Sequence, residues 1–292
     1  KDFNKYYSSV EEERYRLAVY KSNLKKIELH NAQHLPWTMG VNEFADMTED
    51  EFGFKFCGCA KDPKTRAARS TPIYGDAPER VDWREQGAVT PVKDQASCGS
   101  CWSFSTTGTV EGAYFVHSGK LVSLSEQQLV DCATEPEYEA RGCSGGWPWS
   151  VLGYVQKKGL CTEEDYPYHG KDEDCKDDKC TVAVQTAGEV QLPQGDEASL
   201  ANAVAMTPVS IVLDASAMQF YKDGIITKCS ENINHAVLAV GYDTDKETGI
   251  KYWIVKNSWG ENWGEKGYCR IEKDVGGMGR CAITYSSVYP TF

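Results

Sequence analysis

The sequence predicts an α+β fold with two lobes and an additional helical segment at the N-terminus. Three observations support this class. Residues 8–35 form a charged amphipathic stretch, residues 100–160 have a helical pattern, and residues 186–292 contain several runs rich in β-branched and aromatic residues. A helical half followed by a β half predicts a cleft between the two. With 292 residues, of which 41% are hydrophobic, the chain can bury a core in one large or two ordinary domains.

The N-terminal stretch predicts a long helix over residues 8–35. Pro36 ends it, and a Lys/Glu-rich background surrounds its apolar positions. These positions are Tyr15, Val19, Leu24, Ile27 and Leu35. Such a helix is solvated unless a partner surface covers its apolar side. His30 and His34 lie four residues apart, but no carboxylate-bearing metal motif accompanies them, so we expect both on the surface.

Residues 61–76 lack an apolar period and contain two prolines, two arginines and a glycine, which is typical of a linker open to proteolytic processing. Beyond this linker, the sequence predicts a helix over residues 102–116. A second helix over residues 125–131 would begin with a Ser-x-x-Gln cap at Ser125. The β-rich runs predict strands over residues 209–213, 235–240, 251–255 and 267–271.

Composition argues against several classes of partner. The formal net charge is −12, and residues 1–76 carry 12 basic and 12 acidic residues, so the excess negative charge lies in residues 77–292. We therefore expect no binding to nucleic acid or to anionic membranes. No apolar run is long enough to span a bilayer. The sequence pI near 5.0 is compatible with an acidic compartment.

Twelve cysteines favour an oxidising compartment, with a cytosolic metal protein as the competing hypothesis. Metal ligation fits poorly, because the chain has only five histidines and its one Cys-x-x-Cys, Cys98 to Cys101, lacks a second pair at zinc-site spacing. We expect no metal and no cofactor. The chain begins without Met or a signal-type apolar stretch, so we expect that a leader has been removed.

The segment Gln95-Ala-Ser-Cys98-Gly-Ser-Cys101-Trp contains the strongest candidate nucleophile. His235 and Asn257 follow Cys101 by 134 and 156 residues. A thiol attacks a carbonyl only as thiolate, and both a helix N-terminus after Ser100 and an imidazolium partner would stabilise that anion. The alternative is a redox dithiol formed by Cys98 and Cys101, although a thioredoxin-like βαβ pattern is missing.

This segment and these spacings resemble the papain-like cysteine proteases. Two further patterns resemble the motifs of the cathepsin-L-like propeptide, with Tyr20 where Phe is usual. They are Glu12-x3-Arg16-x3-Tyr20-x2-Asn23-x3-Ile27-x3-Asn31 and Gly40-x-Asn42-x-Phe44-x-Asp46. The resemblance implies a latent cysteine endopeptidase with an inhibitory propeptide over residues 1–76 and a papain-like peptidase domain over residues 77–292. Within that domain it implies a helical lobe over about 87–185 and a barrel-like β lobe over about 186–292.

By this resemblance, Cys101 is the nucleophile, His235 its imidazolium partner and Asn257 the residue that orients the imidazole. Gln95, with the backbone N–H of Cys101, would bind the developing oxyanion, and Trp259 would shield the His–Asn hydrogen bond. The substrate-binding residues implied are Gly99, the backbone edge at Gly145 and Gly146, and a pocket formed by Trp147, Pro148, Val212, Ala236 and Ser286. This pocket predicts a bulky apolar residue at P2, because no acid stands at Ser286 to accept Arg. The chain lacks the His-His insertion of carboxydipeptidase relatives, which favours endopeptidase action.

The resemblance also implies disulfides that leave Cys101 outside them. The expected pairs are Cys98–Cys143, Cys132–Cys175, Cys229–Cys281 and, less directly, Cys161–Cys180. We expect Cys269 to be a buried thiol. Cys57 and Cys59 fall near the active site, where one hypothesis is a mixed disulfide with Cys101 and the other is that they fill pockets as small apolar groups.

The expected partners are protein and peptide substrates, the chain's own propeptide and cystatin-like inhibitors, with the protein itself a monomer. We expect entry into the secretory pathway and residence in a lysosome, an acidic vacuole or outside the cell. We expect protonation of Asp46 to favour activation at acidic pH. Two rival functions remain, a noncatalytic papain-like binding protein and a thiol–disulfide oxidoreductase.

Overall fold

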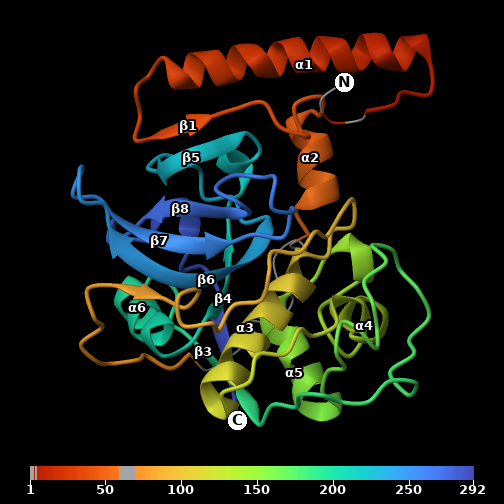
Figure 1. The fold of residues 1–292 in the computed structure, drawn as a ribbon, viewed down its shortest axis with the longest axis vertical. Coiled ribbons are helices and arrows are strands. Elements are labelled where there is room, and N and C mark those ends of the chain that lie inside the picture. The colour runs from red at the N-terminus through yellow and green to blue at the C-terminus, as the bar shows by residue number, and fades with distance from the viewer. Residues whose placement is uncertain (1–2, 4, 59–69) are drawn as a thin grey trace.

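The chain forms a two-lobed body that the N-terminal segment crosses at one end (Figure 1). The computed structural model describes residues 3, 5–58 and 70–292. α1 lies across the top of the view in Figure 1, and α2 descends from that level toward the junction of the lobes. The strands lie to one side of α3, and α4 and α5 lie to its other side. The helices are α1 (Val10–Asn31), α2 (Glu49–Phe56), α3 (Cys101–Ser118), α4 (Glu126–Cys132), α5 (Pro148–Lys158) and α6 (Glu197–Met206). The predicted α+β class is confirmed.

The strands form one sheet in the order β1-β5-β8-β7-β6-β4-β9-β3, and β2 pairs with β6 outside this order. Neighbours are antiparallel except β5 and β8, which are parallel. The first strand belongs to the N-terminal segment, where Trp37 lies opposite Gly224 of β5, so this segment extends the sheet of the β lobe. The bounds are β1 (Trp37–Met39), β2 (Val81–Asp82), β3 (Gly188–Gln191), β4 (Val209–Leu213), β5 (Tyr221–Ile226), β6 (His235–Thr244), β7 (Lys251–Lys256), β8 (Tyr268–Glu272) and β9 (Ser287–Thr291).

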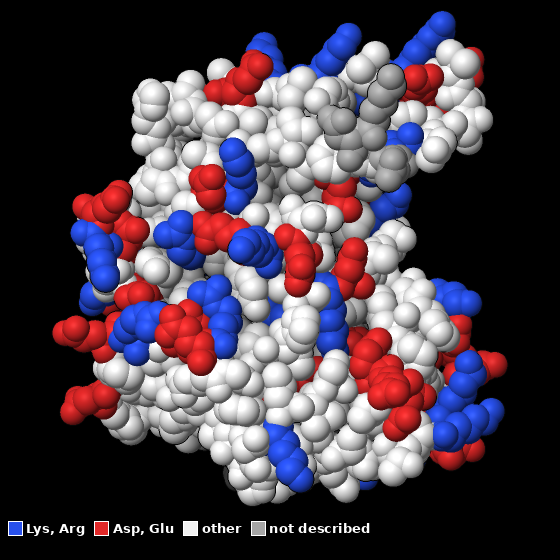
Figure 2. Space-filling model, viewed as in Figure 1, with Lys and Arg blue, Asp and Glu red and all other residues white. Residues whose placement is uncertain are grey.

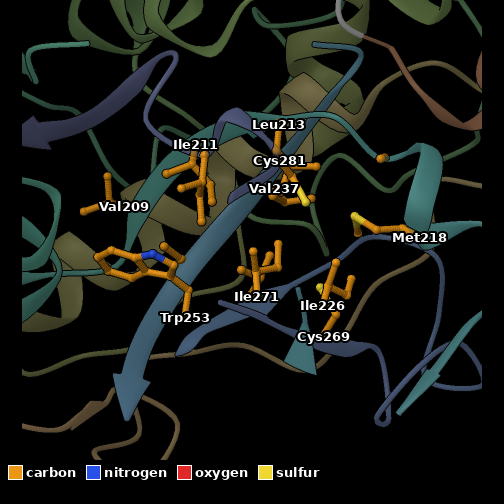
Figure 3. Packing of buried hydrophobic residues seen from close by; sticks show 14 of the residues in the cluster. Val209, Ile211, Leu213, Met218, Ile226, Val237, Trp253, Cys269, Ile271 and Cys281 are labelled. Atoms are coloured by element: carbon orange, nitrogen blue, oxygen red, sulfur yellow. The ribbon is translucent and has the colours of Figure 1, made fainter. Parts of the chain in front are cut away.

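Each lobe has an apolar core. In the β lobe, alternate side chains of β4 point toward Val237 of β6, Trp253 of β7 and Ile271 of β8 (Figure 3). Trp253 is fully buried there, and so is the thiol of Cys269. The core of the helical lobe lies between α3, α4 and α5 and includes Trp102, Val110, Leu129, Val151 and Val155. Burying each large apolar side chain stabilises the fold by about 1.5–3 kcal/mol.

α1 is shorter than the predicted helix and uses a different face. It ends at Asn31, because the following residues turn so that residues 37–39 can form β1. Of the predicted apolar positions Ile27 is buried, whereas Tyr15 is 48% exposed. The expectation that His30 is a surface residue was wrong. Its side chain is 9% exposed, its ring lies 4.0 Å from that of Trp37, and its Nε2 lies 3.2 Å from the Trp37 carbonyl oxygen.

The other sequence-predicted elements are present with small changes at their ends. α3 contains the predicted helix over 102–116, and Ser125 accepts a hydrogen bond from the N–H of Gln128 at 2.9 Å, which confirms the cap of α4. β4 covers 209–213 as predicted, and β6, β7 and β8 each extend beyond the predicted C-terminal residue. α6 lies inside the part predicted as β-rich.

Residues 5–58 and 70–292 contain four disulfides, and they are the expected ones: Cys98–Cys143, Cys132–Cys175, Cys161–Cys180 and Cys229–Cys281. Asp177 lies beside the sulfurs of Cys132 and Cys175, but these sulfurs are joined to each other and offer no thiolate to a metal. The Cys98–Cys143 bond removes Cys98 from a dithiol with Cys101, which weakens the oxidoreductase alternative.

A buried group of charges joins the two lobes. Lys93 donates to Glu126 at 2.6 Å and to Glu111 at 3.1 Å, and both carboxylates belong to the helical lobe. Lys256, at the end of β7, donates to Thr90, whose hydroxyl donates in turn to Glu111. Burial opposes the charge of Lys93, but the two carboxylates raise its pKa above the ordinary lysine value. These bonds hold β7, and therefore the residue that follows it, against α3 and α4.

The surface in Figure 2 carries interspersed acidic and basic side chains rather than a broad patch of one sign. Among the helices of the described residues, none is both long and apolar enough to cross a bilayer.

Candidate active site

Cys101 is the first residue of α3, an 18-residue helix, and its side chain is completely buried. The partial positive charge at a helix N-terminus favours an anion at this position. Two backbone N–H groups point at its sulfur: that of Ala236 at 3.4 Å and that of Gly58 at 3.1 Å. The sulfur therefore lies where the α3 N-terminus, the start of β6 and the N-terminal segment meet, in surroundings that stabilise a thiolate.

His235 and Asn257 form a hydrogen-bonded pair beside this sulfur. The distance from His235 Nε2 to Asn257 Oδ1 is 2.8 Å, and because an amide oxygen only accepts, Nε2 carries the proton. Asn257 Oδ1 also accepts from the backbone N–H of Ser258 at 2.9 Å, which fixes the amide orientation. His235 Nδ1 is buried, and it has no hydrogen-bond partner among the residues that the structure describes. This ring nitrogen is thus available to exchange a proton with the reacting groups.

Trp259 covers the pair. Its ring stacks on the imidazole of His235 with centroids 4.7 Å apart and an interplanar angle of 27°, and its side chain is 1% exposed. Excluding water from the His–Asn hydrogen bond strengthens it, because the local dielectric constant is lower. The indole of Trp259 therefore lies over the imidazole and is itself buried.

Gln95 is fully buried and is held from several sides. Its Oε1 accepts a hydrogen bond of 2.7 Å from the hydroxyl of Ser258, and its backbone N–H donates to the Ser258 carbonyl at 2.9 Å. Its Nε2 donates to the carbonyls of Cys98 at 2.8 Å and Phe56 at 3.2 Å. One of the two Nε2 protons is thus directed to a carbonyl oxygen of the N-terminal segment that lies in the cleft.

The N-terminal segment passes directly over the sulfur. Phe56 presents its carbonyl to Gln95 and to the indole N–H of Trp259, both at 3.2 Å. Two residues later, Gly58 donates its N–H to Cys101 and accepts a 2.9 Å hydrogen bond from the N–H of Gly146. A backbone N–H of the N-terminal segment therefore points at the candidate nucleophile. The segment thus covers the sulfur of Cys101.

The approach at this point is very close. A Cβ atom built on Gly58 would lie 1.9 Å from the carbonyl oxygen of Gly99, so no residue other than glycine fits without a backbone shift. The predicted substrate-binding Gly99 and Gly146 both contact the segment, and Gly145, next to Gly146, has a positive φ of 107°.

The predicted P2 pocket residues come together at the lobe junction. Val212 of β4 lies opposite Ala236 of β6, and its N–H donates to the carbonyl of Ser286 at 3.1 Å. Trp147, Val212 and Ala236 belong to one buried cluster. Pro148, which is also buried, opens α5 directly after Trp147. The side chains that the structure brings together here are therefore apolar or small.

The propeptide-type motif residues connect α1 to the loop that follows β1. Arg16 donates to Glu12 at 3.2 Å and to Glu51 of α2 at 2.7 Å. The amide of Asn23 donates to the carbonyls of Ala45 and Met47 at 3.0 and 2.8 Å. Further along α1, Asn31 exchanges two 2.9 Å hydrogen bonds with the backbone of Met39. Ile27 packs with Ala45 and Phe220, and Tyr20 covers this small cluster.

The second motif docks the segment onto the β lobe. The N–H of Gly40 and the side-chain amide of Asn42 donate to the carbonyls of Phe220 and Gln219. Phe44 is 1% exposed and its ring meets that of Trp259 edge-on, with centroids 5.6 Å apart. Asp46 accepts from the hydroxyl of Tyr7 at 2.9 Å and pairs with Lys5 at 3.3 Å. The first motif therefore organises the segment and the second attaches it.

Cys57 is a buried thiol outside the four disulfides, packed in the β-lobe cluster that includes Phe44, Phe52 and Phe56. Burial raises its pKa well above the ordinary thiol value, and the neighbouring Cys101 adds to this rise. For Cys57, these surroundings suit a small apolar group better than a reactive thiolate. Cys59 lies outside the described residues.

No pattern in the sequence indicated that two hydroxyl groups, those of Ser258 and Tyr168, belong to this site. Ser258 bonds to Gln95 as described, and Tyr168 bonds to both Gln95 and Ser100. Each reaches its partner from far along the chain, so no local pattern could have indicated them.

Comparisons with known proteins agree with this geometry. Residues 77–291 match the model of the papain family cysteine proteases, and residues 1–52 match the cathepsin propeptide inhibitor domain. Cathepsin L of Sarcophaga peregrina is 42% identical over 98% of this chain and 89% of its own length, and human cathepsin L2 is 44% identical over 96% and 86%. The structure of digestive procathepsin L 3 from Tenebrio molitor superposes with a TM-score of 0.86 at 38% identity, covering 100% of this chain and 96% of its own.

The matches cover both the N-terminal segment and the part that bears Cys101, and several matched structures are proforms. The N-terminal segment is thus an inhibitory propeptide, and this chain belongs to the papain family of cysteine proteases as a cathepsin-L-like zymogen.

Proposed function

We propose that this chain is a latent endopeptidase in which Cys101, His235, Asn257 and Gln95 carry out the reaction. The proposal rests on one observation: the sulfur of Cys101 lies beside the N-terminus of α3, the backbone that follows His235, and the His235–Asn257 pair. Cys101 Sγ lies at the N-terminus of α3 and 3.4 Å from the N–H that follows His235, whose Nε2 is bonded to Asn257. An imidazole held in this way can carry a second proton on Nδ1 and pair with the thiolate.

In the proposed reaction, the thiolate of Cys101 attacks the substrate carbonyl carbon and forms a tetrahedral adduct. Gln95 Nε2 and the N–H of Cys101 donate hydrogen bonds to the resulting oxyanion. His235 transfers its Nδ1 proton to the departing amine, which leaves a thioester on Cys101. Water, deprotonated by the same nitrogen, then hydrolyses the thioester and restores the thiolate. Asn257 keeps the ring aligned throughout.

The position of Gly146 supports binding of an extended peptide. Its N–H already bonds to the carbonyl of Gly58, so the same donor can take a substrate carbonyl after the propeptide leaves. The neighbouring pocket of Trp147, Pro148, Val212, Ala236 and Ser286 favours a bulky apolar residue at P2. Ser286 supplies no negative charge, and a buried Arg without a partner is costly.

The domain boundaries and the setting follow from the same proposal. The propeptide covers residues 1–76 and the mature enzyme begins near Ala77, with cleavage favoured at acidic pH. Its partners are protein and peptide substrates and cystatin-like inhibitors that occupy the emptied cleft, and the enzyme acts as a monomer. Four disulfides support passage through an oxidising secretory route. The destination is a lysosome, an acidic vacuole or the outside of the cell.

The test is hydrolysis of fluorogenic peptides by the acid-processed enzyme in reducing buffer, with P2 varied among Leu, Phe and Arg. Cys101→Ala and His235→Ala, processed by an added protease, serve as matched variants. We expect activity in the wild type alone, with Leu and Phe preferred. Activity that survives Cys101→Ala would refute the proposed nucleophile, and equal rates with Arg would refute the assigned pocket.

A further inference from the structure

The hydroxyl of Tyr168 lies between the two parts of the site that would bind the oxyanion. It donates a 2.8 Å hydrogen bond to the backbone carbonyl of Gln95, and it accepts a 2.6 Å hydrogen bond from the hydroxyl of Ser100. Its ring packs edge-on against Phe104 of α3, with centroids 4.9 Å apart. One side chain from a distant loop therefore connects Gln95 to the residue immediately before Cys101.

The peptide unit between Gln95 and Ala96 needs such support. Ala96 has a φ of +52°, the left-handed region that is unfavourable for a residue with a Cβ. The surrounding structure must maintain this conformation. The N–H of this peptide donates to Asp94 Oδ1 at 2.8 Å, and its carbonyl accepts from Tyr168. The two hydrogen bonds hold the peptide plane from opposite edges and so set the direction in which the Gln95 side chain leaves the backbone.

Tyr168 also contacts Ser100, the residue before Cys101. Ser100 is the N-cap of α3, but its side chain makes no capping hydrogen bond to the helix. Its hydroxyl bonds to Tyr168 instead. Because the first N–H groups of a helix point out of its N-terminus, the N–H of Cys101 can serve an anion there. Fixing Ser100 therefore fixes the direction of the adjacent Cys101 N–H.

We propose that Tyr168 is a positioning residue for the oxyanion site: its hydroxyl sets the spacing between Gln95 Nε2 and the Cys101 N–H. Tyr168 touches no substrate and acts through both donors. This inference rests on the proposed function, because the two donors matter only if an oxyanion forms at Cys101. Burial raises the pKa of this phenol, so its hydroxyl keeps its proton, and its donor role, across the working pH range.

The size of the effect can be bounded. Removing one oxyanion donor outright typically lowers the rate about 10²–10³-fold. Losing the hydroxyl of Tyr168 leaves both donors present but less well directed, so we expect a fall in kcat of about tenfold, below that range. KM should change less than about twofold, since the oxyanion exists only in the transition state and the tetrahedral adduct.

Tyr166→Phe provides the matched control for Tyr168→Phe. The two tyrosines flank Pro167, and the hydroxyl of Tyr166 donates to Asp131 at 2.8 Å within the helical lobe, away from Gln95 and Cys101. We expect kcat unchanged in Tyr166→Phe. Ser100→Ala removes the 2.6 Å bond that Tyr168 accepts, together with a long 3.5 Å contact to the Cys98 carbonyl, and should lower kcat by a smaller factor than Tyr168→Phe. This milder variant tests the proposal if Tyr168→Phe folds poorly.

The experiment is a double-mutant cycle with Gln95→Ala on the processed enzyme, measuring kcat and KM with one amide substrate. The rate of thiol alkylation by iodoacetamide is followed against pH in parallel, because alkylation requires the thiolate but no oxyanion. If Tyr168 acts through Gln95, adding Tyr168→Phe to Gln95→Ala should lower kcat by clearly less than the tenfold seen in the wild-type background. The alkylation profile should remain that of the wild type.

Full additivity in the Gln95→Ala background, or a kcat for Tyr168→Phe within twofold of the wild type, would overturn the inference. So would an altered alkylation profile, which would place the effect on the nucleophile instead. A wild-type enzyme without Cys101-dependent hydrolysis would overturn the proposed function itself, and this inference with it. The wild-type control therefore separates the two failures.

Discussion

The backbone N–H of Gly58 lies 3.1 Å from the sulfur of Cys101 and donates a hydrogen bond to it. The propeptide therefore bonds directly to the candidate nucleophile and covers it. Because Gly146 holds the carbonyl of the same residue, both polar groups of Gly58 are used.

Gly58→Ala should weaken latency. The added Cβ would lie 1.9 Å from the carbonyl oxygen of Gly99, and backbone on both sides must shift. Overpacking of this kind costs about 1–3 kcal/mol, or roughly 5–150-fold in the equilibrium between the closed and open cleft. The measurement is peptidase activity of the unprocessed precursor at pH 7. Gly53→Ala is the control, since a Cβ at this position in α2 meets nothing within 4 Å. If the Gly58→Ala precursor were as inactive as the wild-type and Gly53→Ala precursors, the prediction would be contradicted.

His30 should contribute to acid activation. Burial lowers its pKa, and Lys228 on the β lobe acts in the same direction, so the docked propeptide holds this imidazole neutral. Its contribution to docking is complete above the free-histidine pKa of about 6.5. This contribution is lost as the pH falls from about 6.5 toward the lowered pKa of the docked state. In that range the imidazole of the released propeptide takes up a proton, whereas the docked imidazole does not, so protonation favours the released state. Acidification from neutral pH therefore favours propeptide release.

His30→Gln keeps a donor for the Trp37 carbonyl but cannot be protonated. We expect its propeptide to remain bound to lower pH than in the wild type. The measurement is propeptide release against pH in a Cys101→Ala background, which prevents self-cleavage. His34→Gln serves as the control, because this side chain is exposed. If all three release midpoints coincide, His30 takes no part in the pH response.

Asp46→Asn should weaken latency at neutral pH. Asn can still accept a hydrogen bond from Tyr7, but it cannot pair with Lys5, whose Nζ lies 3.3 Å from Asp46 Oδ1. Because the two side chains are only 31% and 12% exposed, this pair should be worth about 1 kcal/mol, the upper end of the range for surface pairs, and precursor activity should rise about fivefold. Initial rates of the uncleaved precursor at pH 7 measure it. Unchanged latency would show that the ion pair between Lys5 and Asp46 does not stabilise the docked propeptide.

Lys93→Met should destabilise the catalytic domain strongly. Lys93 is the shared partner of the buried Glu111 and Glu126, and removing one member of a buried ionic group typically costs about 3–5 kcal/mol. Lys157→Met is the matched control. Its 2.6 Å pair with Glu137 joins two exposed side chains, and solvent screening leaves such a pair little effect on stability. Urea unfolding of both variants at pH 7 measures the loss of stability in each. Similar midpoints would show that the buried charges around Lys93 do not stabilise the contact between the lobes.

The parts of the fold and site that could be predicted depend on local patterns. The Ser125 cap, the β-branched run of β4 and the spacing from Cys101 to His235 and Asn257 are all properties of the sequence itself. By contrast, the contact face of α1 is set by hydrogen bonds from Asn23 to the loop after β1 and from Asn31 to β1 itself. The apolar pattern therefore indicated Tyr15, which is exposed, and missed the burial of His30.

The supporting hydrogen bonds of the site could not be predicted. Tyr168 reaches the Gln95 carbonyl across 73 residues, and Ser258 reaches its side chain across 163. A serine and a tyrosine in loops carry no sign of such partners. The tight approach of Gly58 to Gly99 likewise exists only when the propeptide is docked, because the two glycines belong to different parts of the chain.

The central claim is that the propeptide silences the enzyme by covering Cys101 itself. Brief alkylation with iodoacetamide at pH 6.5, before and after propeptide removal, followed by peptide mass mapping without reduction, tests it most directly. The structure predicts that Cys101 is unmodified in the precursor and becomes the fastest-reacting thiol in the processed enzyme, with the same four disulfides in both. Equal modification of Cys101 in the two forms would contradict the claim, and a disulfide between Cys101 and Cys57 or Cys59 would replace it with a redox latch.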